Sequence, residues 1–202
     1  MQVAIIDYEM GNIASVEKAL KFLNIPSIIT KDRAEIEKAD FIVLPGVGAF
    51  SQGMNNLKKC GLIDLLQAEV ILNKKPFMGI CLGMQLIAEK GYEPIECKGL
   101  GWIEGEVTKI KESGKSIPHL GWNEISAKEN SIISKFDKKD FYFIHSYHFD
   151  VKNSNRIIAT VNYGKNYVAA IQKDNIFATQ FHPEKSQTFG LELMKIFFES
   201  YA

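Results

Sequence analysis

Residues 77–90 read FMGICLGMQLIAEK, and this stretch decides the fold that we expect. Its first four residues are a short apolar run, which is typical of a buried strand. Residues 81–90 then begin a helix. A strand that turns directly into a helix is the building unit of a parallel α/β sheet, so the stretch predicts an α/β fold.

The same alternation of strand and helix fills the chain before this stretch. We expect strands over residues 3–7, 27–30 and 41–45, and helices over residues 12–24, 34–39 and 51–73. Apolar residues at helical spacing support two of these helices: Ile13, Val16, Leu20 and Leu23 in the first, and Met54, Leu57, Leu62, Leu65 and Leu66 in the last. Near-continuous apolar strands in right-handed strand–helix–strand units predict a parallel sheet with helices on both faces.

The C-terminal half changes character. Strands are expected over residues 105–110, 141–147, 157–163, 168–173 and 176–181. Short turns such as NYGKN (162–166) separate them and favour antiparallel hairpins beside the parallel sheet. A last helix is expected over residues 189–201, with Phe189, Leu193, Phe197 and Phe198 facing inward. The fold class is therefore an α/β three-layer sandwich with a mixed, mainly parallel sheet, in a single domain over residues 1–202.

Composition narrows the classes of function. The chain has 24 Lys+Arg and 24 Asp+Glu, and a formal net charge of +0 argues against a broad nucleic-acid-binding surface. The longest apolar stretch, residues 76–89, is shorter than the roughly 20 residues that span a bilayer, and the N-terminus has no signal-peptide features. Three cysteines, an odd number, fit a reducing compartment. We expect a cytoplasmic protein that binds neither nucleic acid nor membrane.

Cys81 lies in GICLG (79–83), where the expected strand meets the expected helix. Glycines two residues before and after a nucleophile are what a nucleophile elbow requires, because the sharp turn crowds those positions. The elbow lifts the sulfur above the strand ends, at a helix N-terminus that stabilises the thiolate. Most intracellular cysteines are buried and inert, and Cys60 and Cys97 fit that description, but the setting of Cys81 favours catalysis.

His182 has the most suitable surroundings for the base that a thiol nucleophile needs. It follows the strand expected over 176–181, and Glu184 comes two residues later in QFHPE (180–184). Residues two apart on an extended chain face the same way, so Glu184 is placed to orient the imidazole, as a carboxylate does in a Ser-His-Asp triad. Alone, HPE is more often a strand-end turn. Together with the elbow it favours a triad of Cys81, His182 and Glu184.

Gly46, Val47 and Gly48 follow the strand over 41–45, at the same sheet edge as Cys81. The loop is open to three interpretations: a tight turn, a phosphate loop or an oxyanion hole. It lacks the rest of G-x-G-x-x-G and any Walker lysine, so phosphate binding is weakly supported. Glycines let backbone N–H groups turn towards a developing oxyanion, and the N–H of Leu82 would be the second donor.

The other histidines show no metal-site pattern. His145 and His148 are three apart in one expected strand, so they should face opposite sides. His119 lies in a turn-like segment, PHLGWN (118–123), without a metal partner. We therefore expect no metal site and no cofactor, and structural or interface roles for His119 and His148.

Four segments resemble the class I, triad-type glutamine amidotransferases. They are PGVGAF (45–50), GICLGMQ (79–85), FIHSY (143–147) and QFHPEKS (180–186), in the order and spacing of that family. The resemblance spans essentially the whole chain. It implies that Cys81 attacks the carboxamide of glutamine, that His182 moves the proton and that Glu184 orients His182.

The resemblance also implies a substrate pocket and a partner. Gly46, Val47 and Gly48 would form an oxyanion strand that can flip. The glutamine pocket would be lined by Gln85, His145, Ser146 and Tyr147. The rim around Cys81, including Asn12, Asn123 and Lys185, would contact a synthase that receives the ammonia directly.

Further segments point to one branch of this family. Four segments resemble the branch whose heterodimer partner is a (β/α)₈ cyclase, with a product that feeds histidine and purine-salvage chemistry: DYEMGN (7–12), PGVGAFSQGM (45–54), IPHLGWN (117–123) and HPEKS (182–186). Residues 88–105 depart from the acidic Ser-Glu-Glu stretch of many members. GLGWIEG (99–105) and HPEKSQTFG (182–190) also resemble a branch that serves a surface-glycan sugar amidotransferase. The sequence therefore leaves open which of these two partner enzymes accepts the ammonia.

Two hypotheses come from other classes of function. A cysteine peptidase or chaperone-like hydrolase would explain Cys81, but not HPEKS or the second glycine loop. A non-catalytic regulatory subunit would be favoured by a missing triad residue, and none is missing. Release of glutamate from glutamine separates these hypotheses from a glutaminase.

Overall fold

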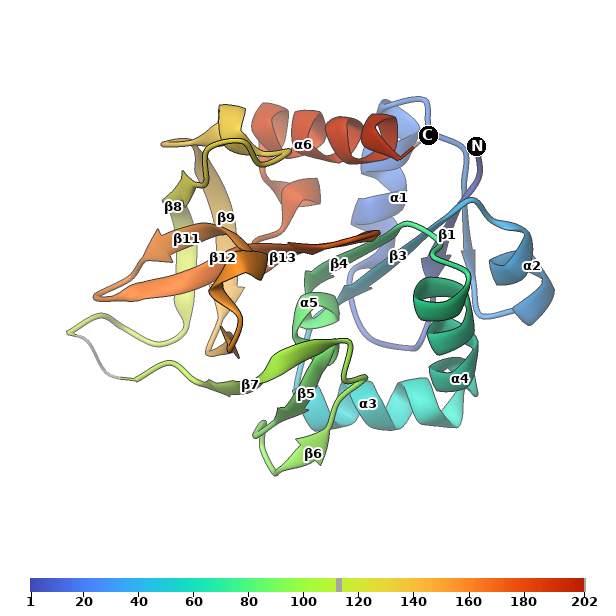
Figure 1. Ribbon diagram of the computed structural model, residues 1–202, viewed down its shortest axis with the longest axis horizontal. Coiled ribbons are helices and arrows are strands. Elements are labelled where there is room, and N and C mark those ends of the chain that lie inside the picture. Colours follow the sequence, from blue (N-terminus) through green and yellow to red (C-terminus); the bar gives the residue numbers. More distant parts are fainter. Residues whose placement is uncertain (112–113, 202) are drawn as a thin grey trace.

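The computed structural model describes residues 1–111 and 114–201, with a nine-stranded sheet at its centre (Figure 1). The strands are β1 (Val3–Ile6), β2 (Ser27–Thr30), β3 (Phe41–Gly46), β4 (Phe77–Cys81), β8 (His119–Ala127), β9 (Asp140–His145), β11 (Ile157–Asn162), β12 (Asn166–Lys173) and β13 (Ile176–Thr179). Their order is β2-β1-β3-β4-β13-β12-β11-β8-β9. In this order, neighbouring strands from β2 as far as β13 pair in parallel, and those from β13 onward to β9 pair antiparallel. The sheet is mixed, as predicted.

Helices cover both faces of the parallel half. Helices α1 (Ile13–Phe22) and α6 (Gln187–Ser200) lie on one face, and α2 (Arg33–Lys38), α3 (Phe50–Lys59), α4 (Leu62–Leu66) and α5 (Leu82–Leu86) lie on the other (Figure 1). In β1, Val3 and Ile5 join the core under α1 and α6, while Ala4 and Ile6 join the opposite core. A strand buried on both faces needs an unbroken apolar run, which explains the pattern of the parallel strands.

A second sheet, which the sequence analysis did not anticipate, packs beside α5. Its strands are β5 (Ala88–Gly91), β6 (Cys97–Lys98), β7 (Ile103–Lys109) and β10 (Tyr147–Val151), in the order β10-β7-β5-β6. The helix expected over 81–90 therefore ends at Leu86. Ala88–Gly91 pairs instead with β7 and β6, so tertiary pairing overrides helical propensity there.

The helix expected over 51–73 is wrong as a single element. Gly61 takes a left-handed backbone with φ 68°, which ends α3 and starts α4 in a new direction. A π-helix over Gln67–Leu72 continues α4. The apolar residues predicted for this region still face the core, because Met54, Leu57, Leu62, Leu65 and Leu66 are all buried.

Three expectations for the C-terminal half also need correction. Residues 141–147 do not form one strand: β9 ends at His145 and β10 starts at Tyr147, in a different sheet. The segment around His119 is not a turn but the start of β8. Phe189 is 38% exposed rather than inward, whereas Leu193, Phe197 and Phe198 are buried as predicted. Short 3-10 helices occupy Ser134–Phe136, Ser154–Arg156 and Pro183–Lys185.

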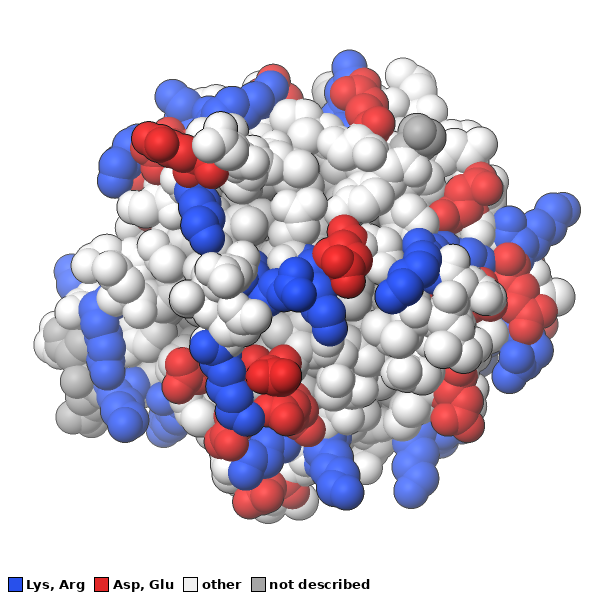
Figure 2. Space-filling model, viewed as in Figure 1, with Lys and Arg blue, Asp and Glu red and all other residues white. Residues whose placement is uncertain are grey.

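Charged side chains of both signs are interspersed on the face drawn in Figure 2. Several form surface ion pairs, such as Lys135 with Glu192 at 2.5 Å and Lys152 with Glu89 at 2.7 Å. Within the described residues, no helix is both long and apolar enough to cross a membrane.

The fold brings three strand ends together at one sheet edge. Gly46 at the end of β3 pairs with Cys81 at the end of β4, and Thr179 of β13 pairs with Ile80. In open α/β sheets, ligands bind in the crevice at the carboxyl ends of the strands. We therefore expect the ligand site at the loops that follow β3, β4 and β13.

Candidate active site

Cys81 occupies a strained turn between β4 and α5. Its backbone has φ 53° and ψ −105°, a conformation that costs a non-glycine residue of order 1–3 kcal/mol. A Cβ on Gly83 would collide with the Leu44 carbonyl oxygen, and a Cβ on Gly79 would lie 2.9 Å from the Gly83 carbonyl oxygen. Both glycines are thus required by close packing, and the predicted elbow is confirmed. The helix that follows Cys81 has only five residues.

His182 and Glu184 form a buried pair next to Cys81. The Nδ1 atom of His182 lies 2.8 Å from Oε1 of Glu184, and each side chain is 2% exposed. The His182 amide donates to the Tyr142 carbonyl, and the Ser186 hydroxyl donates to the His182 carbonyl at 2.6 Å. These bonds fix the backbone that carries the imidazole. The predicted pairing of His182 with Glu184 is found, but the chain there is a 3-10 helix over Pro183–Lys185 and not the extended segment that the prediction assumed.

The electrostatics of His182 favour a charged imidazole. Burial by itself lowers the pKa of His182, but the Cys81 sulfur and the Glu184 carboxylate outweigh burial and raise the pKa to about 10. The Nε2 atom is buried and has no hydrogen-bond partner among the described residues. Since Glu184 holds Nδ1, Nε2 is the nitrogen left for chemistry at Cys81.

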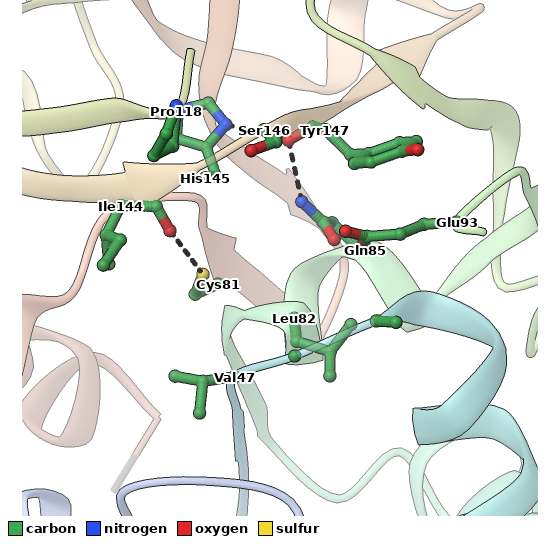
Figure 3. A pocket seen from close by; sticks show the side chains of 12 residues that line it. Val47, Cys81, Leu82, Gln85, Glu93, Pro118, Ile144, His145, Ser146 and Tyr147 are labelled. Atoms are coloured by element: carbon green, nitrogen blue, oxygen red, sulfur yellow. Dashed lines mark hydrogen bonds between the residues drawn. The ribbon is translucent and has the colours of Figure 1, made fainter.

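A pocket of about 340 Å³ opens above Cys81 (Figure 3). Its lining includes eight residues singled out from the sequence: Val47, Gly48, Cys81, Leu82, Gln85, His145, Ser146 and Tyr147. Ala49, Glu93, Pro118 and Ile144 complete the lining. The volume is within the range of small-molecule sites, and the loop after β3, the β4–α5 junction and the β9–β10 turn each supply part of the wall.

Two glutamines tie the pocket wall to the nucleophile. The Nε2 atom of Gln85 donates to the Tyr147 carbonyl and to Oε1 of Gln180, each at 3.0 Å. Gln180 in turn directs its Nε2 towards the Cys81 sulfur at 3.6 Å. Gln180 is fully buried, and the sequence analysis gave it no role. The sequence did contain a signal for a role at the site, because Gln180 lies two residues before His182 and directly after a strand.

Glu93 is the second residue of the site that the sequence analysis missed. It follows β5, in the segment that departs from the family pattern, so no motif drew attention to it. Burial raises the pKa of Glu93, partly offset by a hydrogen bond from the Phe50 amide. A carboxylate in an otherwise mainly apolar and amide-lined pocket suits a cationic group of a ligand.

The glycine loop after β3 lies directly against the elbow. Gly46 is fully enclosed, and a Cβ there would collide with the Tyr8 hydroxyl and the Leu82 side chain. Gly48 has φ 111°, which L side chains rarely adopt. Val47 between them is 36% exposed at the mouth of the pocket. Gly46 pairs with Cys81, and Val47 and Gly48 line the same pocket; the oxyanion role of the loop stays a prediction.

The three predicted rim residues lie outside the pocket lining. Asn12 is exposed and immediately precedes α1. Lys185 places its ammonium 6.0 Å from the centre of the Tyr142 ring. Asn123 on β8 directs its amide nitrogen inward, to the Asn162 carbonyl at 3.1 Å and to His119.

The remaining histidines do not gather into a metal site. His145 faces His119, with Nε2 and Nδ1 3.0 Å apart, while His148 contacts Thr108 on the second sheet. Among residues 1–111 and 114–201, no group of three or more His, Cys, Asp or Glu side chains is arranged to hold a metal ion.

Related sequences span nearly the whole chain. Imidazole glycerol phosphate synthase subunit HisH 1 of Campylobacter jejuni (strain RM1221) is 48% identical over 198 residues, covering 96% of this chain and 98% of the relative. HisH 2 of Pseudomonas aeruginosa is 42% identical over 203 residues, covering 98% of each chain. HisH of Aquifex aeolicus is 43% identical over 200 residues, covering 98% of this chain and 96% of the relative.

Solved structures share the fold at low sequence identity. A crystal structure of a glutamine amidotransferase superposes with a TM-score of 0.77 at 18% identity, covering 98% of both chains. A glutamine amidotransferase from Thermotoga maritima gives a TM-score of 0.66 at 20% identity, covering all of this chain and 82% of the other. The sequence profile described as glutamine amidotransferase class-I matches residues 4–200. With this match and these relatives, the chain belongs to the class-I glutamine amidotransferase family.

Proposed function

We propose that this chain is the glutaminase subunit of an imidazole glycerol phosphate synthase and passes ammonia to a cyclase subunit in histidine biosynthesis. The observation that carries the proposal is the Cys81 elbow beside the buried His182–Glu184 pair, at the base of a pocket. The relatives named HisH, at 42–48% identity over nearly the full length, support the choice of synthase.

The first half of the reaction forms a thioester. The Cys81 sulfur attacks the carboxamide carbon of glutamine, and a C–S bond forms as the carbonyl becomes an oxyanion. His182 gives the proton on Nε2 to the departing nitrogen, which leaves as ammonia when the C–N bond breaks. Glu184 keeps Nδ1 engaged, so only Nε2 takes part. The raised pKa of His182 means that this proton is in place at neutral pH.

The second half returns the free enzyme. Water attacks the thioester carbon and loses a proton to His182, glutamate is released, and the sulfur is regenerated. Both tetrahedral intermediates carry an oxyanion, which N–H groups of the Gly46–Gly48 loop and of Leu82 would stabilise. A loop with two glycines has little intrinsic preference between a backbone N–H and a carbonyl facing the oxyanion. We therefore expect low activity until a partner favours the N–H orientation.

Glutamine recognition follows from the pocket lining. The Glu93 carboxylate is the anionic group there and would pair with the α-ammonium of glutamine. Ser146 and Tyr147 also line the pocket (Figure 3), and Gln85 donates a hydrogen bond to the Tyr147 carbonyl. These contacts would orient the carboxamide towards Cys81.

An exposed apolar surface beside the pocket supports a partner. Leu120 is 58% exposed and Trp122 is 48% exposed on β8, and the facing strand β9 adds Ile144 at 39%. Leu120 pairs directly with Ile144, whose carbonyl oxygen lies 3.9 Å from the Cys81 sulfur. Apolar surface of this kind is typical of a protein interface. We expect a heterodimer with a (β/α)₈ cyclase in the cytoplasm, where Cys81 stays reduced.

The test measures glutamate release from glutamine by the chain alone, with a (β/α)₈ cyclase, and with the cyclase and its acceptor. The proposal expects a low rate for the chain alone and a large rise with the cyclase and acceptor. Parallel reactions with a sugar amidotransferase serve as the matched comparison. A rise only with that enzyme would move the function to glycan synthesis. Equal rates in all mixtures would point to a free-standing glutaminase.

A further inference from the structure

A chain of hydrogen bonds runs behind the pocket from Asn123 to the β9–β10 turn. Asn123 Nδ2 lies 3.3 Å from His119 Nε2, and His119 Nδ1 lies 3.0 Å from His145 Nε2. The chain ends where His145 Nδ1 lies 2.8 Å from the Tyr147 carbonyl oxygen. The triad mechanism uses neither His119 nor Asn123, although both belong to IPHLGWN (117–123).

The direction of every bond in this chain is determined. The Tyr147 carbonyl only accepts, so His145 carries its proton on Nδ1 and, as a neutral ring, accepts on Nε2. His119 must then donate from Nδ1, which leaves its Nε2 as an acceptor. The Asn123 amide nitrogen is a donor and matches that acceptor. One pair of tautomers therefore satisfies all the contacts.

Burial keeps both rings neutral. It lowers the pKa of His119 to about 4 and that of His145 to about 3. His119 also stacks between Phe143 and Tyr163, with ring centres 4.7 and 4.0 Å away. A proton added to His145 would place two N–H groups face to face between the rings, and one added to His119 would place an N–H against the Asn123 NH₂ group. The packed site resists this change.

The chain continues to the nucleophile through the shared Tyr147 carbonyl. That oxygen also accepts from Gln85, which holds Gln180, and Gln180 directs its amide nitrogen to the Cys81 sulfur. The position of one backbone carbonyl thus affects both the pocket wall and the group facing the sulfur.

We propose that His119 is a positioning residue: held by Asn123, it fixes the Nδ1–H tautomer of His145, and thereby the Tyr147 carbonyl and the Gln85–Gln180 pair at Cys81. This role deepens the proposed glutaminase function and rests on it. It also explains the four-residue spacing of His119 and Asn123, because residues at even spacing share one face of strand β8.

Three variants of the full chain test the role. His119→Leu removes both of its hydrogen bonds and leaves His145 Nε2 without a donor, so kcat/KM for glutamine should fall about tenfold. His119→Asn keeps an N–H near the Nδ1 position and should recover to within about threefold of wild type. His148→Leu removes a half-buried imidazole outside the chain and should change kcat/KM less than about twofold. Wild-type kcat/KM in His119→Leu, or no recovery in His119→Asn, would overturn the role.

The ring ¹⁵N NMR signals of the wild-type chain at pH 7 test the hydrogen-bond chain without any activity. We expect His119 and His145 both to be neutral and protonated on Nδ1. A proton on Nε2 of either ring, or a charged ring, would refute the chain. If the wild-type chain hydrolyses no glutamine even with the cyclase and its acceptor, the proposed function fails, while this measurement still decides the arrangement of the histidines.

Discussion

The Nδ1 atom of His182 lies 2.8 Å from the Oε1 atom of Glu184, with both side chains almost completely buried. A carboxylate at this distance fixes the imidazole in one orientation and stabilises its charged form. The opposite nitrogen of the ring is buried without a partner among the described residues, on the side of the Cys81 sulfur. This relationship gives each of the three residues a distinct task, which variants can separate.

Cys81→Ala should abolish glutamine hydrolysis, because the elbow presents no other nucleophile. Ammonia-dependent synthesis by the complex with its partner should persist when ammonium salt is added, since that chemistry belongs to the partner. Both rates are measured on the same preparation. Near wild-type release of glutamate by the variant would rule out the triad.

His182→Asn and Glu184→Gln should differ in severity. His182 moves protons in both halves of the reaction, whereas Glu184 orients and stabilises it. We expect the loss of kcat in Glu184→Gln to be at least about tenfold smaller than in His182→Asn. Steady-state kinetics on both variants decide this, and equal losses would give Glu184 a larger role than orientation.

Glu93→Gln should raise KM for glutamine about tenfold or more with a smaller effect on kcat, because the variant loses a charge-assisted contact to the α-ammonium group. Glu96→Gln is the matched control, since its side chain is 65% exposed three residues further along the chain. Its KM should stay at the wild-type value. An unchanged KM in Glu93→Gln would place the ammonium group elsewhere.

Acid should destabilise the fold through His119 and His145. Their pKa values in the fold, about 4 and about 3, lie below the value near 6.5 of an unfolded histidine. The unfolded chain therefore binds more protons than the folded chain in acid. The contribution of these two histidines to the free energy of unfolding is complete above pH 6.5 and declines as the pH falls towards 4. His182 has the opposite sign: its contribution is complete below pH 6.5 and declines as the pH rises towards 10.

The measurement is the unfolding temperature of wild type and His119→Asn between pH 7 and pH 4.5. The variant lacks one of the two low-pKa rings, so its unfolding temperature should fall less steeply with acid. Parallel curves would show that His119 is not held neutral by the fold.

The sequence predicted the parts of the molecule that depend on local pattern. The parallel strands and the elbow at Cys81 follow from apolar runs and glycine spacing. Pairing between distant segments was not visible. The second sheet converts residues 88–91 from an expected helix to a strand and carries Glu93 to the pocket.

Gln180 and His119 show a second limit of sequence reasoning. Both lie within recognisable motifs, but their partners, Gln85 and His145, are 95 and 26 residues away. Their roles depend on which side chains the fold brings within hydrogen-bond distance. At Gly61 the limit is local instead. The apolar spacing predicted one helix over residues 51–73, but the left-handed backbone of Gly61 divides it.

The central claim is that Cys81 carries the γ-glutamyl group during turnover. The chain, mixed with glutamine and quenched in acid during steady state, is digested and its peptides are analysed by mass spectrometry. The account predicts a γ-glutamyl thioester on the peptide that contains Cys81, and none in Cys81→Ala. Turnover without that adduct, or an adduct on Cys60 or Cys97 instead, would contradict it.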